Sequence, residues 1–197
     1  MIGMNIRHRQ RGVTLVVGLI FLVALTLLGV MAMKNTLLQE RMAGGSRDRS
    51  LAFQAAEAAL RDAKRDILAL RADGAPCVPG TAGCRPATDR PWDAAGLTPF
   101  TSACTNGQCY DNPFVAGYGF GGQPAWLAFP MNAPPSVAYG TFTAAAPIAG
   151  VAAQPRYLIE IFARTDSSNS RYFYRITARA VGANPNTVVM LQEVFAP

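Results

Sequence analysis

The chain has 197 residues, of which 50% are hydrophobic and 15% are charged, with 18 lysines and arginines against 12 acidic residues. One ordinary domain with some extension accounts for this length, which excludes a large multidomain enzyme, and the apolar content excludes a disordered chain. The net charge of +6 is unevenly placed, because no acidic residue precedes Glu40. We therefore interpret the charge as a signal of membrane topology before we consider nucleic acid.

A long apolar segment follows the basic N-terminus. The uncharged run from Gly12 to Met33 contains 22 residues, and a helix needs about 20 apolar residues to cross a bilayer core of roughly 30 Å. Residues 13–33 therefore predict a transmembrane helix. A secretory signal peptide cleaved after Ala32 and a plain signal anchor are the alternatives. A cytoplasmic N-terminus and an exported remainder are predicted because basic residues flank the segment mainly on its N-terminal side: Arg7, Arg9 and Arg11 precede it, and Lys34 follows it.

The border between the basic leader and the apolar segment resembles the processing site of type IV prepilins. It reads Arg11-Gly12-Val13-Thr14-Leu15. In that family a membrane aspartyl peptidase cuts after the glycine and methylates the new N-terminus, so the resemblance implies a leader of residues 1–12 and a mature chain that begins at Val13. Gly12 carries the recognition, since a side chain there would obstruct the approach of the enzyme to the backbone.

The fifth position of that mature chain is Val17, whereas most pilins carry a glutamate there. In the family this carboxylate is thought to neutralise the N-terminal ammonium of the subunit already in the fibre, because an unpaired charge in lipid is costly. A subunit without it suits the first or topmost place in a fibre. Gly18 and Gly29 are expected contact points between membrane helices, since helix association in lipid relies on close packing.

A second helical segment, residues 34–71, is expected to continue outside the membrane. Its apolar residues recur at spacings of three and four, which predicts a narrow stripe with charged residues on the opposite face, and we expect the stripe to pack on a sheet of the same domain rather than in a coiled coil. We predict a bend or loosened turn at Ala43-Gly44-Gly45-Ser46, because glycine weakens a helix. The stripe consists of Phe53, Ala56, Leu60, Ala63, Ile67 and Leu70.

Three strings of sequence resemble the two ends of the PilX-type minor pilins, which are type IV pilus assembly proteins. They are TLLGVMAM, LLQERMAGGSRDRSLAFQAAEAALRDA and YRITARAVGANPNTVVMLQEVF. The resemblance implies a single-pass inner-membrane subunit with a periplasmic domain. It also implies that prepilin peptidase cuts the chain and that the chain then primes pilus assembly in a tip complex with other minor pilins and the major pilin, beneath a large tip adhesin. Twitching motility and adhesion are the implied cellular roles. A type II secretion pseudopilin and a membrane-anchored periplasmic binding domain are the alternatives.

The middle of the chain, residues 72–155, is expected to be a looped region. Residues 76–155 hold 12 of the 14 prolines and only five charged residues, and proline at this density excludes long helices and central strands. Tyr118, Phe120 and Trp126 lie among glycines and are candidate partner contacts, although burial within the domain explains most of the aromatic residues.

All four cysteines of the chain lie in this region, at Cys77, Cys84, Cys104 and Cys109. In an exported chain without a nearby histidine they predict two disulfides rather than a zinc site. Three connectivities are possible. We favour Cys77 with Cys84 and Cys104 with Cys109, because each pair closes a short loop in a Gly- and Pro-rich context.

The C-terminal part, residues 156–197, alternates polar and apolar side chains. Strands are predicted at Tyr157–Thr165, Tyr172–Val181 and Thr187–Phe195, with short connections that indicate an antiparallel meander. One face of this sheet is expected to pack on the helical stripe, which gives an α+β, pilin-like fold. Arg171, Arg175 and Arg179 share one face of the second strand, and we interpret them as a solvated face rather than a nucleic-acid site.

The sequence contains no pattern that predicts catalysis or a cofactor. The part after the leader has no histidine, no phosphate-binding glycine loop and no G-x-S-x-G motif. Asp89, Asp93 and Asp111 lack the spacing of a calcium loop. We expect a structural and interaction protein without enzymatic activity, cofactor or metal.

Overall fold

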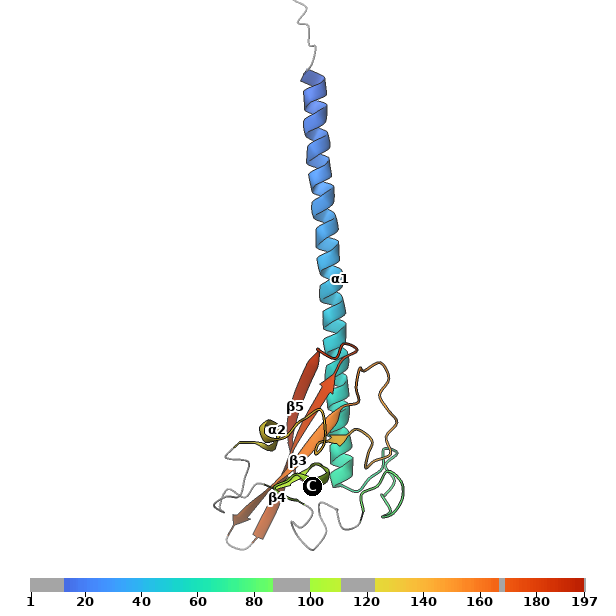
Figure 1. Cartoon of the computed structure of the whole chain (residues 1–197), viewed down its shortest axis with the longest axis vertical. Helices are drawn as coiled ribbons and strands as arrows, with labels where there is room; N and C mark the ends of the chain where they lie inside the picture. The colour runs from blue at the N-terminus through green and yellow to red at the C-terminus, as the bar shows by residue number, and fades with distance from the viewer. Residues whose placement is uncertain (1–12, 87–99, 111–122, 167–168, 197) are drawn as a thin grey trace, which may run out of the picture. The chain divides into compact units, whose positions relative to one another are not determined.

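The computed structural model describes residues 13–86, 100–110, 123–166 and 169–196, and side chains at 32–38 and 163–172 are left out of the description. The chain forms two compact units, Met1–Ser46 and Arg47–Pro197, which we describe separately as the first and the second unit. Helix α1, Val13–Ile67, contributes to both. The second unit then contains a 3-10 turn and the remaining elements: β1 (Gln108–Tyr110), α2 (Ala125–Ala128), β2 (Val137–Ala138), β3 (Arg156–Asp166), β4 (Asn169–Val181) and β5 (Val188–Phe195) (Figure 1).

α1 is one continuous helix, and it ends earlier than predicted. The backbone is helical through Ala43–Ser46, so the helix does not stop and restart there. The bend or loosened turn predicted at this point stays a prediction. Two glycines cost a helix roughly 1–2 kcal/mol, which the long flanking helical segments tolerate. At the other end α1 stops at Ile67 rather than at 71, because Ala69 adopts a φ of 49° and the Leu70 amide donates to the Arg65 carbonyl at 2.8 Å. This is a Schellman-type helix end.

The predicted antiparallel meander is confirmed, since β3 pairs with β4 and β4 pairs with β5, both antiparallel. Two short strands from the proline-rich region join β3. β1 runs parallel to it and β2 antiparallel, which makes the sheet mixed rather than purely antiparallel. Both are short, as expected for a segment rich in proline. The fold class is therefore α+β, as predicted.

One face of the sheet packs against the C-terminal turns of α1, which run beside the strands in Figure 1. Period-two alternation brings the apolar side chains of β3 and β4 to this face. They form a buried core with α1 and Phe100, whose ring centre lies 6.0 Å from that of Tyr174. The β3 and β4 residues of this core are Tyr157, Ile159, Ile161, Tyr174, Ile176 and Ala178, and the α1 residues are Ala59, Leu60, Ala63 and Ile67.

The helical stripe itself is only partly as predicted. Phe53 is 47% exposed and Leu70 lies beyond the helix, while Ala52, Ala55 and Ala59 are buried. Small side chains let the α1 backbone approach the sheet closely. The buried face also includes Asp62 and Asp66, which the sequence pattern placed on the polar side.

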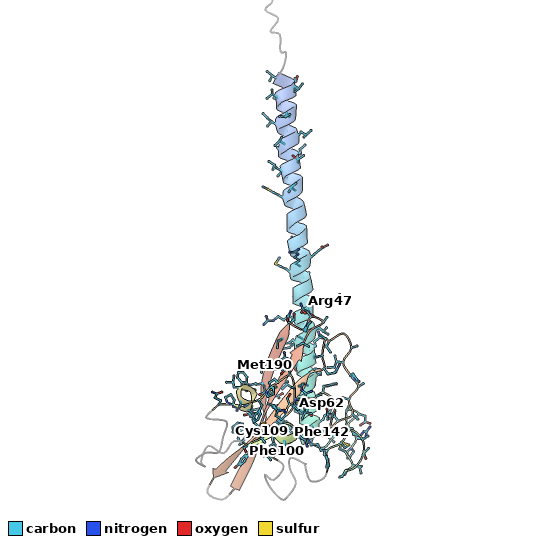
Figure 2. All side chains as sticks on the ribbon, viewed as in Figure 1. Arg47, Asp62, Phe100, Cys109, Phe142 and Met190 are labelled. Carbon is cyan, nitrogen blue, oxygen red and sulfur yellow. A yellow bond between two sulfur atoms is a disulfide. The ribbon has the colours of Figure 1, made fainter. Side chains whose placement is uncertain are left out.

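The opposite face of the sheet is covered over β3 but open over β5. Leu158 is buried there with Cys104, Cys109, Ala125 and Met131, and Trp126 packs against this cluster. The apolar side chains of β5 that point to this face are exposed, namely Val188, Met190 and Val194. Figure 2 shows the side chains, with Cys109 and Met190 labelled.

Candidate functional site

The first part of α1 has the properties of a membrane anchor. Residues Val13–Met31 form 19 consecutive helical residues that are long and apolar enough to cross a bilayer, and none of this window is buried within the protein. Large apolar side chains exposed in this way are costly in water. The composition of this segment therefore indicates membrane association.

The residues expected to take part in processing lie at the start of this segment. Helix α1 begins at Val13, whose side chain is exposed. Gly12 lies outside the described residues. Val17 lies one turn into the helix and is also exposed, so the position where most pilins carry a carboxylate is apolar and accessible.

Gly18 and Gly29 lie on one side of the same helical segment, because eleven residues correspond to about three turns. A Cβ built on either glycine would meet no atom of the described residues within 4 Å. Packing within the described part of the chain therefore requires neither glycine, and both leave the helix backbone accessible there.

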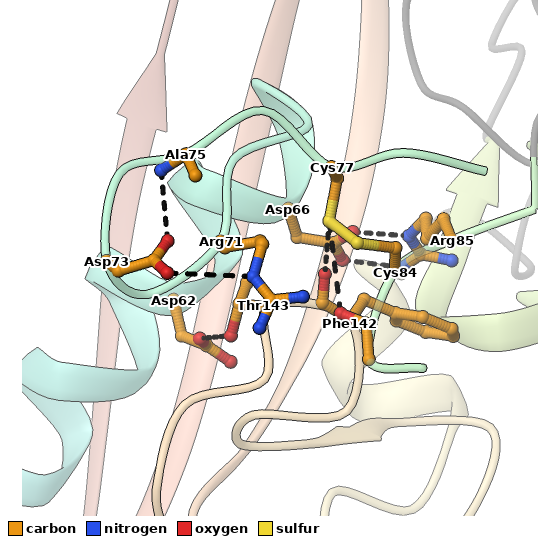
Figure 3. Close-up of a disulfide and its surroundings, with 11 residues drawn as sticks. Asp62, Asp66, Arg71, Asp73, Ala75, Cys77, Cys84, Arg85, Phe142 and Thr143 are labelled. Atoms are coloured by element: carbon orange, nitrogen blue, oxygen red, sulfur yellow. Dashed lines mark hydrogen bonds and ion pairs between the residues drawn. A yellow bond between two sulfur atoms is a disulfide. The ribbon is translucent and has the colours of Figure 1, made fainter. Parts of the chain in front are cut away.

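Two disulfides fasten the proline-rich region, and they have the sequential connectivity favoured from the sequence. Cys77 is bonded to Cys84, and Cys104 to Cys109. The second pair is buried beneath α2 against Leu158. The first pair lies at the C-terminal end of α1, next to a group of buried polar side chains (Figure 3).

Asp66 is the centre of this polar group. Its carboxylate accepts two hydrogen bonds from Arg85, at 2.6 Å from Nε and 2.7 Å from Nη2, and a third from the Tyr157 hydroxyl at 2.8 Å. The Arg85 guanidinium also lies 3.9 Å from the centre of the Phe142 ring. Burial raises the pKa of Tyr157 well above its usual value, and the charge of Asp66 adds to this, so Tyr157 remains a hydrogen-bond donor.

Asp62 lies one turn before Asp66 on the same buried face, but neutral groups satisfy it. The Gly140 amide donates to Oδ2 at 2.7 Å and the Thr143 hydroxyl donates to Oδ1. Burial raises the pKa of Asp62, and these two hydrogen bonds oppose the rise. Gly140 has a φ of 78°, and a Cβ there would collide with the Ala145 carbonyl, so the position that donates this amide to Asp62 requires glycine.

Two family models match the chain. The PilX N-terminal model matches residues 11–61, and the model described as type IV pilus assembly protein PilX C-term matches residues 77–197. The chain belongs to the PilX family. No curated protein and no solved structure matches it.

PilX membership confirms the resemblance inferred from the sequence and explains the architecture. The PilX family consists of structural proteins of type IV pilus assembly with a pilin-like fold, not of enzymes, and this chain is a minor pilin of that kind. Its apolar α1 and its disulfides fit that family. We accordingly interpret the buried carboxylates of the second unit as groups that stabilise its fold.

The arginine row on β4 differs from the predicted solvated face. Arg175 donates to the carboxylate of Glu160 at 2.8 and 2.6 Å, and Glu160 is fully buried. Glu160 also accepts from the Ala125 amide at 2.9 Å, which fixes the start of α2 over the sheet. Arg179 is half-buried, and the side chain of Arg171 lies outside the described residues. The PilX sheet thus uses Arg175 as a counter-ion rather than as surface charge.

A further contact joins α1 to the turn between β4 and β5. The Asp48 carboxylate accepts from the Ala183 amide at 2.6 Å and the Asn184 amide at 3.3 Å. A side-chain hydrogen bond from Thr187 is the main cause that lowers the pKa of Asp48. Gly182 permits this approach, since a Cβ there would collide with the Asp48 carboxylate.

The aromatic candidates for partner contact divide into two groups. Tyr118 and Phe120 lie outside the described residues. Trp126 is on α2 and is half-buried against the cluster around Leu158, so it contributes to the interior of the PilX domain.

Within the described residues, no group of three or more His, Cys, Asp or Glu side chains is placed to hold a metal ion. Asp89, Asp93 and Asp111 lie outside that part of the chain.

Proposed function

We propose that this PilX-family protein primes type IV pilus assembly as a minor pilin in a tip complex with other minor pilins and the major pilin, beneath a large tip adhesin. Twitching motility and adhesion would then depend on it. The observation that carries the proposal is α1, because one helix supplies an apolar segment long enough for a membrane and, further on, the core of a folded unit. A subunit of this kind can be held in the membrane and extracted into a fibre.

The proposed topology is a single inner-membrane span with the second unit in the periplasm, followed by transfer to the pilus tip on the cell surface. The support is the charge around the span, with Arg7, Arg9 and Arg11 before it and Lys34 behind it. The prepilin leader is residues 1–12, and prepilin peptidase cuts between Gly12 and Val13. Residues 34–67 then lead from the membrane to the sheet.

N-terminal mass analysis of the membrane-extracted protein should show a chain that begins at Val13 and carries one added methyl group. A Gly12→Leu variant should keep the leader, because the side chain obstructs the peptidase. A wild-type chain that begins at Met33, or that still begins at Met1, would contradict the assignment as a processed pilin.

Close packing of membrane helices is proposed to occur at Gly18 and Gly29. Gly18→Leu should reduce the number of surface pili, since a larger side chain holds neighbouring helices apart. Val16→Leu is the matched control, because two residues correspond to about 200° around the helix and the substitution stays apolar. Normal piliation in Gly18→Leu, counted by electron microscopy, would contradict the proposal.

The place of the subunit in the fibre is proposed from Val17. A topmost subunit has no neighbour above it whose N-terminal ammonium could pair with a carboxylate. Val17→Glu should therefore leave a charge unpaired in lipid and lower piliation, whereas Val17→Leu should not. Piliation at the wild-type level in Val17→Glu would place the subunit elsewhere in the fibre.

A type II secretion pseudopilin is the second candidate. Deletion of the gene separates the two, since the proposed function requires loss of surface pili and twitching with protein secretion unchanged. Loss of secretion with pili intact would favour the pseudopilin.

A further inference from the structure

Arg85, the cation of the buried ion pair, directly follows a disulfide-bonded cysteine. Cys84 ends the loop that its bond to Cys77 closes, and Arg85 is the next residue. The side chains of Arg85 and Asp66 are only 3% and 1% exposed, and their closest atoms are 2.6 Å apart. The buried positive charge is therefore carried by the residue next to the disulfide (Figure 3).

The other cysteine is fixed to the end of the helix that carries Asp66. The Cys77 amide donates to the Ala69 carbonyl at 2.7 Å, and Leu70 and Pro76 form an isolated bridge. The Cys77 sulfur lies 3.6 Å from the Phe142 carbonyl oxygen, in the segment whose ring covers Arg85. The disulfide thus joins Cys84 to Cys77, whose amide is bound to the carbonyl of Ala69, three residues beyond Asp66.

The disulfide also forms part of the wall around the ion pair. A cavity of about 10 Å³ is lined by the pair itself and by Ala69, Cys77 and Phe142. That volume holds at most about one water molecule. Burying an ion pair so completely carries a large desolvation cost, which its attraction offsets only when the geometry is held closely.

Gly83 allows the loop between Cys77 and Cys84 to pack closely against the segment that contains Phe142. It has a φ of 77°, and a Cβ there would lie 2.7 Å from the Cβ of Ala144. The loop from Cys77 to Cys84 is therefore shaped to fit against residues 142–144, which places its last cysteine, and Arg85 after it, at the buried carboxylate.

We propose that oxidation of Cys77 and Cys84 places Arg85 against Asp66, so that the second unit completes its buried ion pair only after this disulfide has formed. The two thiols lose two protons and two electrons as the S–S bond forms, and a disulfide-containing oxidant accepts both and becomes a dithiol. In the reduced chain Asp66 keeps Tyr157 but loses the restraint that holds its cation. Under the proposed topology, the unit is then completed only after export.

Coupling between the disulfide and the ion pair tests this inference. Full-length protein in detergent micelles is unfolded in urea, and the midpoint is compared with and without Cys77→Ser/Cys84→Ser in two backgrounds, wild type and Asp66→Asn/Arg85→Met. The second background has no buried charges to bring together. We expect loss of the disulfide to lower the midpoint about two-fold more in wild type than in this background.

A third background provides the matched control. Lys64 and Glu193 form an ion pair at 2.5 Å in the same unit, but their side chains are 30% and 37% exposed. In Lys64→Met/Glu193→Gln, loss of the disulfide should lower the midpoint as much as in wild type. Equal effects in all three backgrounds would overturn the inference, since a disulfide that only restricts the unfolded chain acts independently of Arg85.

Chemical modification gives a second measurement that does not depend on removing the Cys77–Cys84 disulfide or the ion pair by mutation. Native Cys104→Ser/Cys109→Ser protein, which keeps only the Cys77–Cys84 disulfide for a phosphine to reduce, is treated with phenylglyoxal before and after reduction, and the modified arginines are identified by mass spectrometry. Arg85 should be protected when oxidised and modified when reduced, while modification of Arg175, held by Glu160, stays unchanged. An Arg85 that is protected in both states, or modified in both, would overturn the inference.

Discussion

Arg85→Met should destabilise the second unit by about 3–5 kcal/mol, because it leaves the Asp66 carboxylate buried without its cation. The carboxylate would keep only the hydrogen bond from Tyr157 of the three that it accepts from these two residues. Urea unfolding of the full-length protein in micelles measures the effect, with the fluorescence of the two tryptophans, Trp92 and Trp126, as the probe. A urea slope of about 1–3 kcal/mol per molar converts this loss into a midpoint shift of at least roughly 1 M.

Two further variants make the Arg85 result specific. Asp66→Asn/Arg85→Met removes both charges and should recover most of the stability, since a neutral pair of similar volume avoids the cost of burying charges. Lys64→Met breaks a partly exposed ion pair and should cost less than about 1 kcal/mol. A loss below about 1 kcal/mol for Arg85→Met would contradict the view that Asp66 stays buried in this variant with no other group in place of its cation.

The parts of the fold that could be predicted from the sequence are those with a local pattern. The apolar run after Arg11 and the alternation from Tyr157 to Phe195 each depend only on neighbouring residues, and helix and strand geometry converts them directly into structure. Both correspond to elements of the fold, α1 and the strands β3 to β5. The strands β1 and β2 could not be predicted, because a strand of two or three residues is defined by its partner β3 rather than by its own sequence.

The buried charges could not be predicted for the same reason. Asp62 and Asp66 resemble any acidic residues on the polar side of a helix, and their partners lie far away in sequence, with Arg85 19 residues from Asp66 and Thr143 81 residues from Asp62. One signal was present. Each aspartate directly precedes a stripe residue, Ala63 or Ile67, so it lies at the edge of the apolar face, where a close approach to the sheet buries it.

The roles proposed for residues of the membrane segment cannot be derived from contacts within the chain. Val17 and the two glycines gain their meaning from neighbours in a membrane or fibre, and the isolated chain leaves all three accessible. Their proposed roles rest on the resemblance to pilins and on helix packing in lipid, and the variants described above test them, whereas the disulfides and the ion pairs are properties of the second unit itself.

Replacing Asp62 should have opposite effects depending on what replaces it. Asp62→Leu removes the acceptor for two donors, the partly buried Gly140 amide and the buried Thr143 hydroxyl, which costs up to about 1–3 kcal/mol for each. Asp62→Asn can accept from Gly140 with its oxygen and donate to the threonine oxygen with its nitrogen, so both hydrogen bonds remain. It also removes a buried charge. We expect Asp62→Leu to be clearly destabilised at pH 7 and Asp62→Asn to be as stable as wild type or more so.

The pH dependence of these variants identifies the buried charge as the cause. Burial raises the pKa of Asp62 above its usual value of 3.8, so the folded state binds a proton more tightly than the unfolded state. The stability that this group contributes is therefore greatest below pH 3.8 and is lost as the pH rises through its folded-state pKa. Asp62→Asn does not titrate, so its stability relative to wild type should increase with pH across that window and then stay constant. Urea midpoints measured at a series of pH values test this, and a relative stability that decreases with rising pH would show that Asp62 is favoured in its charged form.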